Sequence, residues 1–226
     1  MYKAILLSYN IDEATPIYPG TSPLAIRKAK EINSGDPCNT FSITLSNHSG
    51  THIDMPKHFF DFGKSVKDYP VHKLTCKHPV IIDCPKRPGE IIEAKDLAGL
   101  SAEKNMDVLL VRTGFYKYRS SDVAVYCNNN PSLSPEAALW IRQNLLNLKI
   151  FGIDSISISS KARKGIGAES HRILLADEGY KGDPVLILED LYLPDELKAI
   201  NELMTFPVFS ADIDSSPCTV IGIIHD

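Results

Sequence analysis

One stretch of the chain has the sequence Asn47-His48-Ser49-Gly50-Thr51-His52-Ile53-Asp54-Met55-Pro56-Lys57-His58, directly after the alternating segment Phe41-Ser42-Ile43-Thr44-Leu45-Ser46. Three imidazoles and one carboxylate fall within eleven residues here, although the whole chain has only seven histidines. Imidazole and carboxylate groups are ligands that divalent ions such as zinc and manganese accept. The stretch therefore predicts a metal site or a catalytic site, and the alternative is a set of unrelated polar side chains on a surface turn.

The spacing of these side chains requires a bend in the backbone. In a straight strand, which rises roughly 3.3 Å per residue, His48 and His52 would lie about 13 Å apart, too far for one ion to bridge. A helix would bring residues four apart together, but Gly50 and Pro56 disfavour a helix here. We therefore expect the chain to fold back near Gly50. The period-two alternation of Phe41–Ser46 predicts a half-buried strand, and we expect the histidines to follow its end.

Short apolar runs elsewhere in the chain predict buried strands, and two segments predict helices. The strands are expected at Ala4–Ile11, Val80–Ile82, Val108–Val111, Ile150–Ile158, Val185–Leu188 and Thr219–Ile224. One helix begins at Ser134, which can cap it, with Pro135 tolerated in the first turn, and a short one covers Glu169–Ala176. The loop Asp12–Pro23, with three prolines, could reach over a site. This pattern predicts a single α/β domain over residues 1–226, with a mixed β-sheet core and flanking helices.

Composition excludes several classes of protein. With 43% hydrophobic and 23% charged residues, the chain is globular and not disordered, and its formal charge of −4 leaves no basic stripe for nucleic acid. Its apolar runs are too short for a signal peptide or a membrane span, and its five cysteines form no C-x-x-C pair. We expect a cytoplasmic protein with reduced thiols, a small-molecule substrate, and no nucleic-acid or membrane partner.

The segment from His48 to His58 resembles the H-x-G-T-H-x-D-x-P-x-H signature of the cyclase family of metal-dependent hydrolases, which includes bacterial kynurenine formamidases. Further similar segments cover most of the chain, at Thr15–Gly20, Leu110–Gly114, Asn130–Leu133, Gly152–Asp154 and His171–Leu175. The resemblance implies a fold of the swivelling β/β/α type and a homodimer or homotetramer. It also implies two divalent metal ions as cofactors, usually zinc and in some relatives manganese.

The resemblance also implies a ligand set. By motif position, His48, His52 and Asp54 would bind the first ion, and Asp54 would bridge to a second ion held by His171. A glutamate on a later strand would complete the ligand sets of both ions, and Glu189 fits that position best. Its alternatives are Asp190 and Glu178, because the intervening segment 176–184 is longer than we expect for the formamidases.

Two further assignments follow from the same comparison. His58 would donate and accept protons beside the metal, as an imidazole titrating near neutrality can, and its alternative role is that of a ligand. Asp212 and Asp214 precede Ser215, where the similar family segment often has glycine. We assign these two carboxylates a structural role before a chemical one.

The resemblance implies hydrolysis of a carbon–nitrogen bond. A bound divalent ion lowers the pKa of its water from about 16 to about 7, which supplies hydroxide for attack on an amide carbonyl. The leading hypothesis is an arylformamidase that cleaves N-formylkynurenine in tryptophan breakdown. The alternatives are a hydrolase of cyclic amides such as isatin, and a metal-containing binding protein without activity. Tyr18 replaces the tryptophan that formamidases tend to have, and it is expected to bind the aryl group of the substrate by stacking.

Overall fold

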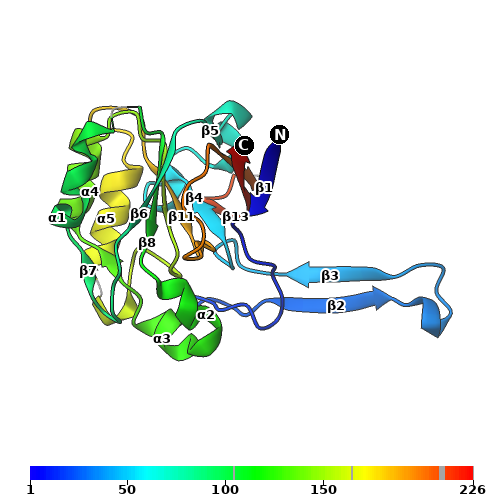
Figure 1. Ribbon diagram of the computed structural model, residues 1–226. Helices are drawn as coiled ribbons and strands as arrows, with labels where there is room; N and C mark the ends of the chain where they lie inside the picture. The colour runs from blue at the N-terminus through cyan, green and yellow to red at the C-terminus, as the bar shows by residue number, and fades with distance from the viewer. Residues whose placement is uncertain (104, 164, 209–211, 226) are drawn as a thin grey trace.

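The computed structural model describes residues 1–103, 105–163, 165–208 and 212–225 (Figure 1). Its strands are β1 Tyr2–Leu6, β2 Ala25–Lys30, β3 Thr40–Thr44, β4 His52–Asp54, β5 Thr75–Cys76, β6 Pro79–Asp83, β7 Ile91–Ile92, β8 Val108–Arg112, β9 Ser132–Leu133, β10 Ile150–Ile153, β11 Leu186–Glu189, β12 Glu202–Pro207 and β13 Ser215–His225. Its α-helices are α1 Ala94–Leu97, α2 Tyr118–Ser121, α3 Val123–Asn128, α4 Pro135–Asn144 and α5 Ile166–Leu175. Within the described ranges, no helix is long and apolar enough to cross a membrane.

The main sheet is mixed and has two halves that meet at β4. Its strand order is β5-β12-β13-β4-β11-β10-β8-β6, with β1 also paired to β13. Strands β6, β8, β10 and β11 run parallel to one another, whereas β4 pairs antiparallel with β11 on one side and with β13 on the other. The predicted α/β class with a mixed sheet and flanking helices is confirmed, and β4 is the strand that joins the two halves.

Two apolar cores lie on opposite faces of the parallel strands, because successive side chains of a strand point to opposite faces. Leu109 and Val111 of β8 pack on the side that helices α4 and α5 cover, whereas Val108 and Leu110 pack with residues of β4, β12 and β13. Each such buried aliphatic side chain contributes roughly 1.5–3 kcal/mol relative to exposure. Helix α4 starts as predicted, because the Ser134 hydroxyl accepts a hydrogen bond from the Ala137 amide at 3.0 Å. The helices therefore cover one face of the sheet.

The segment Phe41–Ser46 departs from its predicted half-buried environment. The structure places Thr40–Thr44 in β3, which pairs with β2 in a hairpin that projects from the body of the molecule (Figure 1). All five residues of β3 are exposed. The alternating pattern correctly favoured a strand, but alternation does not determine whether the apolar face finds a partner within the same chain.

Several predicted boundaries also differ. The first strand is Tyr2–Leu6 and ends before the predicted Ile11, and the second helix already begins at Ile166. The strand predicted over Ile150–Ile158 ends at Ile153. There the buried Asp154 carboxylate accepts hydrogen bonds from the amides of Thr113 and Gly114, both at 2.8 Å, and the chain leaves the sheet. The residues that follow become a loop lining the candidate site instead of a longer strand.

Candidate metal centre

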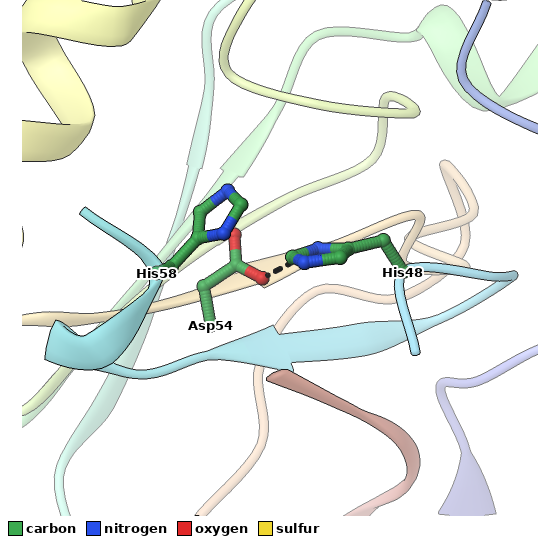
Figure 2. Close-up of side chains that lie close together, drawn as sticks. All are labelled: His48, Asp54 and His58. Carbon is green, nitrogen blue, oxygen red and sulfur yellow. Dashed lines mark ion pairs between the residues drawn. The ribbon is translucent and has the colours of Figure 1, made fainter. Parts of the chain in front are cut away.

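The predicted bend at Gly50 brings the motif histidines together. Gly50 has a φ of 63°, a conformation that glycine adopts readily, and the rings of His48 and His52 have centroids 5.1 Å apart. His52 and Asp54 lie at alternate positions of β4, so both face the same side of the sheet. A 3-10 turn over Pro56–His58 then carries His58 to within 4.3 Å of the His48 ring, measured between centroids. Figure 2 shows His48, Asp54 and His58 converging on one space from these three backbone segments.

Strand β11 and helix α5 complete the cluster. Glu189 pairs in register with His52, which places its carboxylate beside that imidazole, with Oε2 3.4 Å from His52 Nε2. The other oxygen, Oε1, lies 3.3 Å from Nε2 of His171, and it also accepts hydrogen bonds from the Ser157 hydroxyl and the Ile158 amide. Asp54 lies between these groups, with Oδ1 3.6 Å from His52 Nε2 and Oδ2 3.7 Å from His171 Nε2.

The hydrogen bonds of His52 and His171 determine which ring nitrogen faces the carboxylates. Nδ1 of His52 lies 2.8 Å from the Gly50 carbonyl oxygen, and Nδ1 of His171 lies 2.7 Å from that of Gly167. A carbonyl only accepts, so both Nδ1 atoms must donate, which in a neutral imidazole leaves a lone pair on Nε2. These lone pairs would face carboxylate oxygens, an arrangement that is stable only with a cation between them. Either a proton or a metal ion can provide that charge.

The carboxylates of the cluster are buried, and that of Asp54 is short of hydrogen-bond donors. Both oxygens of Asp54 are inaccessible, and neither has a hydrogen-bond partner among the described residues. Burial opposes its negative charge, but His52 and His48 outweigh burial and hold the pKa of Asp54 well below its usual range. Burial likewise opposes the charge of Glu189, and hydrogen bonds from His171 and His52 lower its pKa to about 2. A buried anion without donors is the environment that a divalent cation satisfies.

Among the residues that the structure describes, two groups of side chains are close enough to hold an ion. One contains His48, Asp54 and His58, and the other contains His52, Asp54 and Glu189, with the ligand atoms of each group within 4.8 Å of one another. Asp54 belongs to both, as a bridging carboxylate would. The residues present therefore fit a divalent metal, and the donor set of nitrogen and oxygen suits zinc or manganese.

The structure thus brings together every ligand residue expected from the sequence, His48, His52, Asp54, His171 and Glu189. Of the alternatives to Glu189, Glu178 is exposed, and the Asp190 carboxylate is held by Arg119 at 2.8 Å and by the Tyr126 hydroxyl at 2.5 Å. His58 lies beside the cluster, in a position compatible both with proton transfer and with binding a metal ion.

Asp214 is the site residue that sequence reasoning missed. Its Oδ2 lies 2.7 Å from Nδ1 of His58 and 3.0 Å from Nε2 of His48. Burial opposes the charged form of His48, but Asp214 and Asp54 outweigh it and raise the pKa of His48 to about 10. The family-like segment beginning at Asp214 was the available signal, and the structural role that we gave it was too narrow.

A cavity of about 260 Å³ opens beside the histidine–carboxylate cluster. Besides the imidazoles and Glu189, its lining consists of Tyr18, Thr21, Phe59, Ile156, Ser157, Ser159 and Ala168. The Phe59 ring stacks on His171 with centroids 5.1 Å apart. The predicted loop Asp12–Pro23 therefore does reach the site, through Tyr18. Tyr18 and Phe59 form aromatic walls of the same cavity that the candidate ligands line.

A mixed α/β scaffold that gathers imidazoles and carboxylates beside a cavity suits an enzyme that binds a divalent metal ion. The family model described as "Putative cyclase" matches residues 5–160. The chain belongs to the cyclase family. The protein is a hydrolase of the amidohydrolase type.

Individual relatives are similar to this chain over nearly its whole length. The chain is 28% identical over 215 residues to a kynurenine formamidase of Geobacillus thermodenitrificans, an alignment covering 93% of this chain and 92% of the relative. It resembles the solved structure of isatin hydrolase A from Labrenzia aggregata with a TM-score of 0.83 at 22% identity, covering 100% of this chain and 94% of the other. A potential metal-dependent hydrolase with cyclase activity gives a TM-score of 0.75 at 20% identity, with both chains fully covered.

Proposed function

We propose that the protein is an arylformamidase that hydrolyses N-formylkynurenine with the help of two zinc ions. The observation that carries this proposal is the shared chamber, in which Tyr18 and Phe59 flank the histidine–carboxylate cluster. The similarity to a kynurenine formamidase along 93% of the chain supports the same substrate class. The shared carboxylate of Asp54 supports two ions over one.

The size and lining of the cavity limit the substrate. At about 260 Å³, the cavity is below the range of roughly 300–1,000 Å³ typical of sites for drug-sized ligands. It therefore suits a small molecule built on one aromatic ring better than a peptide. Aromatic walls favour an aryl group by offset stacking, worth roughly 0.5–1.5 kcal/mol beyond area burial. Thr21 and Ser159 add hydroxyls that can orient a polar substituent.

The chemistry requires a polarised carbonyl, a water and a proton for the departing nitrogen. Divalent ions held by the cluster would polarise the carbonyl and acidify a water. His58 has its Nδ1 occupied by Asp214, so its Nε2 is the atom that would accept a proton from the attacking water and pass it to the amine as the C–N bond breaks. Water adds across that bond, and the products are formate and the free aryl amine. Tyr18 and Phe59 hold the ring in place and exclude bulk solvent.

A substrate panel tests this proposal. The protein is stripped with a chelator, reloaded with zinc or manganese, and assayed with N-formylkynurenine, formanilide, isatin and a simple lactone. We expect the highest kcat/KM with N-formylkynurenine and zinc. Faster opening of isatin would replace the formamidase assignment by a cyclic-amide hydrolase. Full metal content without turnover of any of these compounds would instead indicate a binding protein.

Association and location form a separate part of the proposal, and we infer a cytoplasmic homodimer or homotetramer. The β2–β3 hairpin exposes Ile32, Phe41 and Ile43, and an isolated two-stranded hairpin is only marginally stable in water. All five cysteines are free thiols, which fits a reducing compartment. Light scattering on the purified protein should give a mass of two or four chains, and a monomer would contradict the oligomer.

A further inference from the structure

The Asp214 carboxylate lies between two imidazoles that have different tasks in the proposed reaction. Its backbone is fixed because the Met55 amide donates to the Asp214 carbonyl at 2.9 Å, just before β13 pairs with β4. Its side chain is fixed as well, since the side-chain nitrogen Nδ2 of Asn47 donates a hydrogen bond to Asp214 Oδ1 at 2.6 Å. The remaining oxygen, Oδ2, faces His48 Nε2 at 3.0 Å and His58 Nδ1 at 2.7 Å.

An ionised carboxylate only accepts hydrogen bonds, so both ring nitrogens that face Asp214 must carry a hydrogen. In a neutral imidazole the opposite nitrogen then has the lone pair. For His48 that atom is Nδ1, which lies 3.1 Å from Asp54 Oδ1, inside the candidate metal group. For His58 it is Nε2. Figure 2 shows the His48 ring directed at Asp54 along this contact.

We propose that Asp214 is a positioning residue that sets the tautomers of both imidazoles, so that His48 ligates the metal through Nδ1 and His58 exchanges protons through Nε2. The inference rests on the proposed metal-dependent function and adds a residue to it. One carboxylate then links the metal shell to the proton-transferring group. Carboxylates that hydrogen-bond a ligating histidine are known to fix its orientation and raise its basicity.

The pair Asp214→Asn and Asp212→Asn separates this role from a general charge effect. Asp212 is exposed, lies two residues earlier and pairs with Lys57 and Lys67, so its substitution removes the same charge without touching either imidazole. Asparagine at position 214 keeps one acceptor oxygen and no charge, so its NH2 group must face either the two ring N–H groups or the Asn47 side-chain NH2, and the three hydrogen bonds that Asp214 accepts cannot all remain. Zinc titration of the chelator-treated proteins by calorimetry should show binding weaker by roughly 10–100-fold for Asp214→Asn and unchanged for Asp212→Asn.

The imidazole ¹⁵N spectrum of the zinc-loaded parent tests the tautomers without any variant. We expect His48 to show a hydrogen on Nε2 with zinc on Nδ1, and His58 to show a hydrogen on Nδ1. Zinc on Nε2 of His48, or parent-like affinity in Asp214→Asn, would overturn the inference while leaving the proposed function intact. Failure of the parent itself to bind zinc would overturn the metal-dependent function, and this inference with it.

Discussion

Gly167 lies in the first turn of α5, against the loop that carries Ser159 and one turn before His171. A Cβ at Gly167 would lie less than 3.0 Å from Cα, Cβ and Oγ of Ser159, whereas ordinary contacts begin at 3.4 Å. The Gly167 carbonyl is also the hydrogen-bond partner of His171 Nδ1, at 2.7 Å. The substitution Gly167→Ala must therefore displace α5 with its imidazole, or displace the loop that contacts Glu189.

The effects of Gly167→Ala on fold stability partly cancel. Alanine is favoured over glycine inside a helix by about 1 kcal/mol, and overpacking costs about 1–3 kcal/mol, so the net loss is about 0–2 kcal/mol. The metal site is more sensitive than the fold. A ligand displaced by on the order of 1 Å should weaken zinc binding at least as much as loss of an outer-shell partner, about 10–100-fold, and reduce the rate by about 100-fold.

Zinc calorimetry, a thermal melt and a formamidase assay measure these three quantities. The matched control is Gly99→Ala, because a Cβ at Gly99 meets nothing within 4 Å and Gly99 has no positive φ. We expect the control to resemble the parent in all three measurements. If Gly167→Ala binds zinc and turns over substrate like the parent, the contact with Ser159 does not position His171, and the reasoning is refuted.

Four other predictions follow from the site. Asp54→Asn should strip metal and abolish hydrolysis, because a neutral amide cannot replace a carboxylate shared by two cations, and full occupancy by elemental analysis would exclude the bridging role. His58→Ala should keep its metal yet lose about 10²–10⁴-fold in kcat, with the exposed His72→Ala as a control, whereas loss of metal would make His58 a ligand. In the metal-free protein, the pKa of His48 is raised from 6.5 to about 10, so its contribution to stability is complete below pH 6.5 and disappears as the pH rises toward 10. The melting temperature of the chelator-treated protein should therefore fall between pH 6.5 and pH 9, and a flat profile would contradict this charge state. Tyr18→Ala should raise KM for aryl formamides at unchanged metal content, and Tyr18→Phe isolates the hydroxyl; equal kcat/KM for Tyr18→Ala and the parent would remove Tyr18 from the substrate wall.

The parts of the site that lie within one short segment could be predicted from the sequence. Between His48 and His58, a single bend is enough to bring the side chains together, and Gly50 marks where that bend must lie. His171 and Glu189 were found only through resemblance to a family, because no local rule connects a helix and a strand so far along the chain. The strand register that sets Glu189 beside His52 is a property of the folded sheet.

Other features depend on tertiary partners that no local pattern contains. Asp214 meets His58 across 156 residues of chain, and its role follows from the pairing of β13 with β4. Strand β12 was not predicted at all, and β3 was predicted in the wrong environment. In each case the local sequence favours a conformation, and the surrounding fold decides what the conformation contacts.

The position of strand β4 means that a bound metal ion would also favour correct folding of the sheet. The strand has only three residues, with His52 and Asp54 on the site side and Ile53 packed in the apolar core between them. A slip of one residue against β11 and β13 would exchange these faces, placing a carboxylate in the core and an isoleucine in the site. Only the correct register offers the ion its ligands, so at a hundred times its dissociation constant the ion would favour that register by about 2.7 kcal/mol. A bound ion would then stabilise the correct strand pairing over the shifted one. We expect chains made under metal starvation to accumulate in misregistered, aggregation-prone forms.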